Sequence, residues 1–398
     1  MVRPAEIQID LARSAGTATK GDQLLRLIRA SQPVTRTELA ERLGVDKSTV
    51  TENIKPLITS GILLEEGIDG GTHGRKRRVL SFARSNDYFV GINLGVRHTQ
   101  VGATSLNGDI IDESDFETPK SADSALRIVR ERIAAISSSR DGRLPKVIGV
   151  SVPGMTYANR TGLLFAPNLS WRNVDIASAL TTKNETKVVV ENDATAAAMF
   201  EARVRIRDAE TGLMSNFILV RSGTGIGVGL VIGSEVYRGS GVGRGVAGEF
   251  GHMTIVAGGR PCVCGNRGCW EKYASAASAA SLYMGDRPPK GNETVPRFVE
   301  IVAKAENGEV RSQRTLEKIG EYLGIGIANV IMGIGIPRVV ISGRLVYACS
   351  INKKQVASFT RAEVVAPGKL KSTDGVYGLR FAHNTDATVT DFKKTKAQ

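Results

Sequence analysis

Near the start of the chain, apolar positions recur at helical spacing in three short segments. The first predicted helix covers residues 21–30, and its apolar stripe includes Leu24 and Ile28. The second starts after Thr35, because Thr35 and Glu38 have the spacing of a capping box, and Gly44 ends it. The third starts after Asp46, an expected N-cap, and turns inward Val50, Ile54, Leu57 and Ile58. The last two helices, joined by a tight turn, predict a helix-turn-helix.

Two strand patterns follow, at residues 62–66 and 79–82, separated by a glycine-rich loop and four consecutive cations at 75–78. This order predicts a winged helix-turn-helix that binds double-stranded DNA. The outward face of the third helix carries short hydrogen-bonding side chains and lysines, which suit base edges and phosphates in a major groove. The residues expected there are Lys47, Ser48, Thr49, Thr51 and Lys55, and Arg75 and Lys76 are expected to contact DNA from the wing.

An alternative interpretation is that this segment does not bind DNA. A small helical unit can be a dimerisation module, and a basic run is often only a solvated face. The basic composition does not decide, because residues 1–84 hold 14 Lys/Arg and 10 Asp/Glu, an excess of 4 out of a net charge of +13 for the whole chain. The order of helix, loop and basic wing favours DNA.

After about residue 85 the pattern changes to apolar strands that alternate with helices, which predicts α/β layers. Strands are expected at 88–96, 99–104, 147–152, 188–190, 217–221 and 338–342, and helices at 121–138, 194–202 and 313–332. Residues 83–87 are the expected linker. With 398 residues, 41% hydrophobic and 23% charged, the chain is long enough for two or three ordinary domains.

No segment predicts a signal peptide or a membrane span. The first 20 residues are polar and mixed in charge, and the most apolar window, 323–342, is interrupted by Asn329, Pro337 and Arg338. We expect a cytoplasmic protein.

Three of the four cysteines lie together. Cys262, Cys264 and Cys269, with His252, supply three sulfurs and one nitrogen, a complete tetrahedral set for a structural zinc ion with no open position. The alternative is a group of reduced thiols without metal. Cys349 lies apart from the cluster.

An ordered set of motifs resembles the ROK family of sugar kinases and sugar-responsive repressors. The strongest match is Ala-Gly-Glu-Phe-Gly-His at 247–252, followed by Cys-Val-Cys-Gly-Asn-Arg-Gly-Cys-Trp-Glu at 262–271. Ser-Val-Pro-Gly at 151–154, Ala-Pro-Asn-Leu at 166–169, Glu-Asn-Asp at 191–193 and Gly-Thr-Gly-Ile-Gly at 223–227 support it. The resemblance covers nearly the whole chain.

The resemblance implies a two-lobed actin/hexokinase-like (ribonuclease H-like) α/β fold behind the winged helix-turn-helix. The expected domains are 1–84 for DNA binding, 85–195 for the first lobe and 196–398 for the second lobe with the zinc site. The C-terminal segment is left open as a possible return to the first lobe, and 376–398 lacks the alanine-rich helix typical of the family.

The resemblance also implies which residues contact a sugar. They are Gly154, Asn168, Asn192, Asp193, Glu249, His252 and Glu271. Carboxylates and amides suit this role because each can accept several hydroxyl donors in a fixed pocket. Taken alone, Asp193 could be only the N-cap of the helix that starts at Ala194.

Asp193 lies at the position of the general base in ROK kinases, but the first phosphate loop departs from the family. Where those kinases have Asp-x-Gly-Gly-Thr, this chain has Asn93, Gly95, Val96 and Arg97. The carboxylate is lost and Val96 adds bulk where phosphate approaches the backbone. We expect no useful kinase activity, and then Gly223, Gly225 and Gly227 need only be tight-turn glycines.

The leading hypothesis is a sugar-responsive repressor, a homodimer or homotetramer that binds an operator and takes a sugar or sugar phosphate between the lobes. One alternative is a sugar kinase with an added DNA-binding head. The other is a repressor controlled by a protein partner, with a relict sugar pocket.

Overall fold

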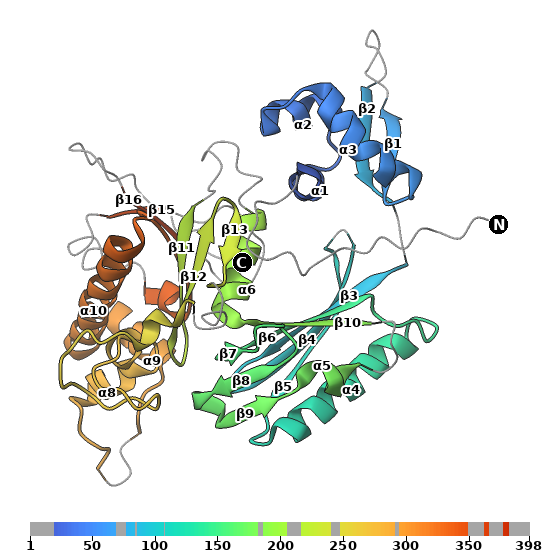
Figure 1. Cartoon of the computed structure of the whole chain (residues 1–398). Helices are drawn as coiled ribbons and strands as arrows, with labels where there is room; N and C mark the ends of the chain where they lie inside the picture. Colours follow the sequence, from blue (N-terminus) through green and yellow to red (C-terminus); the bar gives the residue numbers. More distant parts are fainter. Residues whose placement is uncertain are drawn as a thin grey trace.

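The computed structural model (Figure 1) describes residues 20–68, 77–83, 86–106, 108–181, 186–204, 216–239, 247–290, 294–348, 362–365 and 377–381. Along the chain it shows a small N-terminal domain followed by two α/β lobes. The predicted fold class is therefore confirmed.

The N-terminal domain has three helices and an antiparallel two-stranded sheet. Its elements are α1 (Lys20–Ser31), α2 (Arg36–Leu43), α3 (Lys47–Thr59), β1 (Leu63–Ile68) and β2 (Arg77–Phe82). The capping box is confirmed, because the Glu38 backbone N–H donates to the Thr35 hydroxyl and the Thr35 N–H donates to the Glu38 carboxylate. Gly44 ends α2 in the left-handed conformation. Asp46 takes the N-cap position of α3, but its side chain makes no capping hydrogen bond.

The core of this domain is the one expected from the apolar stripes. Its fully buried members include Leu24, Ile28, Leu39, Val50, Ile54, Leu63 and Leu80. Leu25, Leu57 and Ile58 pack against them while partly buried. Helix α3 thus packs one face into the core and exposes the other face to solvent.

The first lobe is built on a five-stranded sheet. The strands are β3 (Tyr88–Leu94), β4 (His98–Ser105), β5 (Ile110–Glu117), β6 (Val147–Val152) and β10 (Lys187–Asn192), in the order β10-β6-β3-β4-β5. Strands β6 and β10 run parallel to β3, so their carboxyl ends, at Val152 and Asn192, meet at one edge. Helices α4 (Ala122–Ser138) and α5 (Ile176–Leu180) lie on one face of the sheet (Figure 1).

A smaller sheet extends the carboxyl edge of the first lobe. It contains β7 (Met155–Thr156), β8 (Leu163–Ala166) and β9 (Trp171–Val174), and the short helix η1 (Pro167–Leu169) joins the last two. Gly154 starts it with φ 149°, and a Cβ there would lie 2.3 Å from the Phe165 carbonyl oxygen. Glycine is required at this position by backbone contact.

The second lobe is a six-stranded sheet with helices on both faces. The strands are β11 (Phe217–Ser222), β12 (Ile226–Ile232), β13 (Glu235–Tyr237), β14 (Arg338–Gly343), β15 (Ala362–Val365) and β16 (Tyr377–Phe381), in the order β13-β12-β11-β14-β16-β15. The helices are η5 (Glu249–His252), α7 (Glu271–Ala274), α8 (Ser278–Met284), α9 (Phe298–Glu306), α10 (Val310–Ile334) and η6 (Arg344–Ala348). The two described C-terminal strands pair inside this sheet, not with the first lobe.

Helix α6 (Asp193–Val204) leaves the first sheet and packs against the second, so the predicted lobe boundary at 195/196 falls inside a helix. The packing is close because two glycines of β12 face α6. A Cβ at Gly227 would lie 2.7 Å from Ala194 Cβ, and one at Gly229 would lie 2.5 Å from Ala198 Cβ. The prediction that Gly227 is a turn glycine is therefore wrong, since it allows strand and helix to approach.

Among the described residues, no helix combines the length and apolar character that a membrane crossing requires.

Candidate functional site

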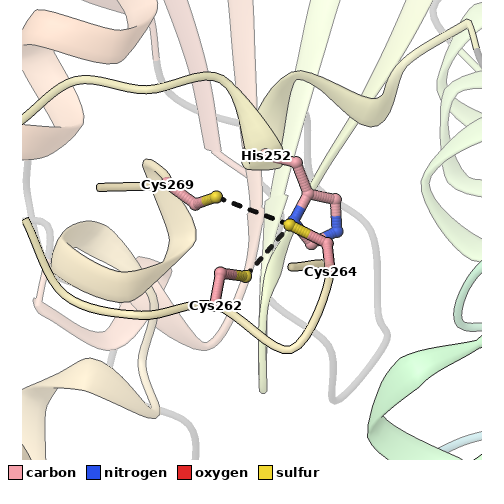
Figure 2. Close-up of side chains that lie close together, drawn as sticks. All are labelled: His252, Cys262, Cys264 and Cys269. Carbon is pink, nitrogen blue, oxygen red and sulfur yellow. Dashed lines mark hydrogen bonds between the residues drawn. The ribbon is translucent and has the colours of Figure 1, made fainter. Parts of the chain in front are cut away.

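The predicted metal ligands come together in the loop that follows η5. His252 ends η5, and Cys262, Cys264 and Cys269 lie on the loop before α7, with their four ligand atoms within 4.8 Å of one another (Figure 2). Cys264 Sγ is 3.7 Å from Cys269 Sγ, and Cys262 Sγ is 3.5 Å from His252 Nδ1. A tetrahedral zinc ion requires about 3.8 Å between two sulfurs and about 3.6 Å between sulfur and nitrogen. The donor set and its spacing fit zinc.

Backbone pairing holds this loop in shape. Thr254 bridges Cys269 and Pro261 bridges Arg267, while the Cys262 N–H donates to the Asn266 carbonyl at 2.9 Å. Gly268 has φ 75°, and a Cβ there would lie 1.8 Å from the Val256 carbonyl oxygen. Backbone contacts alone therefore fix the conformation of this loop.

Burial raises the pKa values of the Cys262 and Cys269 thiols. In the metal-free protein these thiols stay protonated, and Cys262 donates to the Glu271 carboxylate at 3.3 Å. Zinc binding must therefore release thiol protons, which couples metal affinity to pH.

His252 connects the metal cluster to two predicted sugar contacts. Its Nδ1 lies 3.9 Å from Glu271 Oε1, and its Nε2 lies 3.8 Å from Glu249 Oε2. With Nδ1 on the metal, Nε2 faces the Glu249 carboxylate, a typical outer contact for a metal-bound histidine. Burial, with the charges of Asp193 and Glu271, raises the pKa of Glu249 to about 7. Three acidic side chains of the predicted set thus act on one another electrostatically.

Asn168, from the first lobe, lies near Glu271 of the second lobe. A Cβ on Gly225, in the loop between β11 and β12, would lie 2.3 Å from Glu271 Oε2 and 3.9 Å from Asn168 Nδ2. Glu271 is 6% exposed, whereas Asn168 is exposed and makes no hydrogen bond within the described chain. Gly225 leaves open the space between a buried carboxylate and a free amide from opposite lobes.

Asn192 and Asp193 stand where β10 meets α6. The Asn192 amide donates to the Gly154 carbonyl at 3.1 Å, and its oxygen accepts from the N–H groups of Ala194 and Thr195. Asn192 therefore supplies most of the capping interaction expected of Asp193, whose side chain accepts from one backbone N–H among the described residues, that of Ala194. The second Asp193 oxygen, Oδ2, accepts from Arg221 Nε at 3.2 Å.

Arg221 is a site residue that the sequence interpretation missed. It is the second-last residue of β11, whose members from Phe217 to Val220 are fully buried. A single cation at the end of such a strand, directly before a glycine-rich loop, was the available signal. Its partner, 28 residues away, could be identified only from the fold.

The altered first phosphate loop is bonded internally. The Asn93 amide donates to Gln100 Oε1 at 3.1 Å, and its oxygen accepts from the Ser151 hydroxyl at 2.9 Å. A Cβ at Gly95 would lie 2.5 Å from the His98 carbonyl oxygen. Asn93 thus serves as a link between β4 and β6.

Most of the predicted DNA-contacting residues are available on α3. Lys47, Ser48 and Lys55 are exposed, and Thr49 is partly buried. Thr51 is also partly buried, and its hydroxyl accepts from Arg36 at 3.1 Å. Arg75 and Lys76 lie outside the described residues. The described end of the wing keeps Arg77 paired with Glu38 and Arg78 paired with Glu65.

Comparisons with known proteins agree with this organisation. The ROK family model matches residues 89–378, and a winged helix-turn-helix DNA-binding model matches residues 23–63. The chain is 32% identical over 314 residues to the xylose repressor of Bacillus subtilis (strain 168), covering 77% of each chain. It is 28% identical over 257 residues to a glucokinase of Streptomyces coelicolor, covering 61% of this chain and 77% of the glucokinase.

Solved structures support the fold. A ROK family transcriptional regulator described as a homologue of the Escherichia coli MLC protein superposes with a TM-score of 0.68 at 22% identity, covering 86% of this chain and 88% of the other. The family model spans well over half of the sequence, and the motifs that it unites meet at the site described above. The chain therefore belongs to the ROK family.

Proposed function

We propose that the chain is a sugar-responsive, DNA-binding transcriptional regulator, a repressor of genes for carbohydrate uptake or breakdown. The observation that carries the proposal is that one chain has both an exposed face on α3 and a cluster of hydrogen-bond acceptors suited to sugar hydroxyls. The similarity to a xylose repressor extends over 77% of both proteins, and a winged helix-turn-helix DNA-binding model matches residues 23–63.

The effector site is proposed at Asn168, Asn192, Asp193, Glu249, His252 and Glu271, with Gly154 supporting it from the backbone. Asn168 and Glu271 come from different lobes, so a ligand bound to both holds the lobes in one arrangement. Such a ligand changes DNA affinity only if it binds one arrangement better than the other. The proposed partner is a second copy of the chain, because two-fold operators require a dimer or tetramer.

The proposed metal is one structural zinc ion, held by His252, Cys262, Cys264 and Cys269. Closed four-ligand sites stabilise local structure and leave no position for catalysis. Here such an ion would fix the loop between Glu249 and Glu271, the two carboxylates that flank His252.

The test is a selection of bound fragments from sheared genomic DNA at about 150 mM salt, where non-specific phosphate binding is weak. Enrichment of a few palindromic sites supports the proposal. Lys55→Ala should weaken binding to such a site. It should also lower the slope of log K against log salt concentration by about one. The matched control is Lys318→Ala on α10, which should leave both unchanged. Zinc-loaded, folded protein that enriches no site would contradict the repressor.

A sugar kinase with a DNA-binding head is the second candidate, since Asp193 is retained. ADP release with hexoses, abolished by Asp193→Asn, would favour it. We propose instead that turnover is absent, because the first phosphate loop lacks its carboxylate and Asp193 is paired with Arg221. A protein-controlled repressor would show intact operator binding and no sugar-induced shift in Tm.

A further inference from the structure

Arg221 places a cation next to the proposed sugar acceptors. Its Nε donates to Asp193, and no other hydrogen bond or ion pair of its side chain exists among the described residues. The side chain is about one-third exposed. Two terminal nitrogens of the guanidinium therefore remain available as donors.

Ser342 lies beside Arg221 on the neighbouring parallel strand. The two residues are register partners in β11 and β14, so they are about 4.8 Å apart. Phe217, Leu219 and Val340 pack toward α6, and side chains alternate along a strand, so Arg221 and Ser342 share that face. The Ser342 hydroxyl is buried and has no hydrogen-bond partner within the described chain.

These two donors occur at the carboxyl ends of parallel strands, where α/β sheets bind ligands. A phosphoryl group suits them because guanidinium nitrogens and a hydroxyl can donate to its several oxygens. A neutral sugar gains less from Arg221, because a hydrogen bond from the guanidinium to an uncharged hydroxyl is weaker than one to an anionic phosphoryl oxygen. The neighbouring carboxylates require that the anionic end of a ligand lie on the Arg221 side.

We propose that Arg221, with Ser342, selects an effector that carries a phosphoryl group, so that the ligand is a sugar phosphate. This inference rests on the proposed function and specifies its ligand. The sugar part occupies the Asn168–Glu271 end, and the phosphoryl group occupies the Arg221 end.

The test compares matched ligands on the full-length zinc-loaded protein by calorimetry. The probes are glucose, glucose 6-phosphate, xylose, xylose 5-phosphate and inorganic phosphate. We expect one sugar phosphate to bind at least 10-fold more tightly than its parent sugar. Arg221→Gln should reduce that preference at least 10-fold and Arg221→Lys less, whereas Arg132→Gln, on an exposed face of α4, should retain it.

A parent sugar that binds as tightly as its phosphate would overturn the phosphoryl assignment while leaving the proposed function intact. Inorganic phosphate that binds as tightly as any sugar phosphate would also overturn it. If no sugar or sugar phosphate binds while operator binding persists, the sugar-responsive function itself fails.

A different set of contacts joins the sugar site to the DNA-binding domain. Glu191, directly before Asn192, is 8% exposed and accepts from Arg238 Nε at 2.8 Å and pairs with Arg160 at 3.2 Å. Three residues before Arg238, Glu235 of β13 forms an ion pair with Arg26 of α1. Gly233 and Ser234 both have left-handed φ values, the tight turn that fixes β13 against β12.

We infer that β13 transmits the state of the sugar site to the DNA-binding domain. A shift of Glu191 moves Arg238, and the short strand carries Glu235 with it against α1. This inference also rests on the proposed function, because it concerns how sugar alters operator affinity.

A charge-reversal cycle tests it, with the ratio of operator Kd values with and without effector as the readout. Arg26→Glu or Glu235→Arg should bring the ratio at least 5-fold closer to one, and the double swap should restore it. Arg127→Glu, which breaks a surface pair with Glu131 on α4, is the control for charge reversal alone. Single reversals that leave the ratio unchanged would overturn the relay. A wild-type ratio of one for every sugar and sugar phosphate would instead overturn the proposed function.

Discussion

The two ends of the proposed ligand site have diverged differently from the ROK pattern. At the proposed sugar end, Asn168, Glu249 and Glu271 lie in motifs that match the family, and His252 of the proposed zinc site lies beside Glu249. At the phosphate end, Asn93 replaces the family carboxylate, and its amide links two strands of the first sheet. The proposed function requires that sugar recognition persist without phosphoryl transfer, which is chemically consistent because binding needs acceptors whereas transfer also needs phosphate loops and a free base.

The largest expected effect comes from removing a metal ligand at the sugar end. Cys269→Ser should abolish stoichiometric zinc and lower the Tm by roughly 10 °C, because structural zinc sites contribute folding free energy directly. Metal analysis and thermal unfolding measure both. Cys349→Ser, which changes a cysteine outside the motif, should keep one zinc per chain. Equal Tm values for Cys269→Ser and the wild type would show that the cluster is only a group of thiols.

The next effect concerns the packing behind Glu271. A Cβ on Gly326 of α10 would lie 2.0 Å from the Trp270 ring, so Gly326→Ala should cost about 1–3 kcal/mol in the free energy of unfolding. Gly333→Ala on the same helix meets no atom within 4 Å and should be neutral or stabilising by up to about 1 kcal/mol. Denaturant unfolding distinguishes the two. Equal free energies of unfolding for the two variants would mean that Trp270 moves aside without loss of stability.

A pair of identical substitutions separates the two ends by ligand affinity. Asn168→Ala should weaken binding of the effector about 5- to 10-fold, the value of roughly one lost hydrogen bond. Asn93→Ala should leave the effector affinity within two-fold, because both ends of that amide are bonded to protein. Calorimetry on zinc-loaded protein measures both constants. An equal loss in the two variants would mean that the ligand contacts Asn93 as well as Asn168.

Local signals explain which parts of this site were predictable. The capping box at Thr35 and the cluster from His252 to Cys269 depend on spacing along the chain, so the sequence predicts them well. Contacts between distant segments were not predictable. The pairing of Arg221 with Asp193 needs two strands and α6 in place.

The same limit explains the glycine that was misassigned. In the sequence, Gly227 belongs to an apparently continuous glycine-rich loop, and only the structure shows that β12 begins at Ile226. At Gly227, that strand approaches α6 too closely for a side chain. Likewise, Asn192 and Asp193 are adjacent, so the sequence alone could not decide which one caps α6.

The smallest expected effect is from repairing the phosphate end. The variant Asn93→Asp with Val96→Gly restores two family features of the first loop, yet we expect ADP release to stay at background with glucose or xylose. Arg221 still holds Asp193, whose oxygen must be free to accept the proton of the attacking hydroxyl. Adding Arg221→Gln frees that oxygen. In this series, the triple variant is the first in which turnover is expected to exceed background.

A coupled assay with a ROK glucokinase as positive control measures this series. Turnover in the two-residue variant that Asp193→Asn abolishes would contradict the expectation, and it would show that the first loop alone had suppressed catalysis. Turnover that requires Arg221→Gln would instead identify the ion pair as a second, independent block. The order in which activity returns therefore separates loss of phosphate positioning from loss of the base.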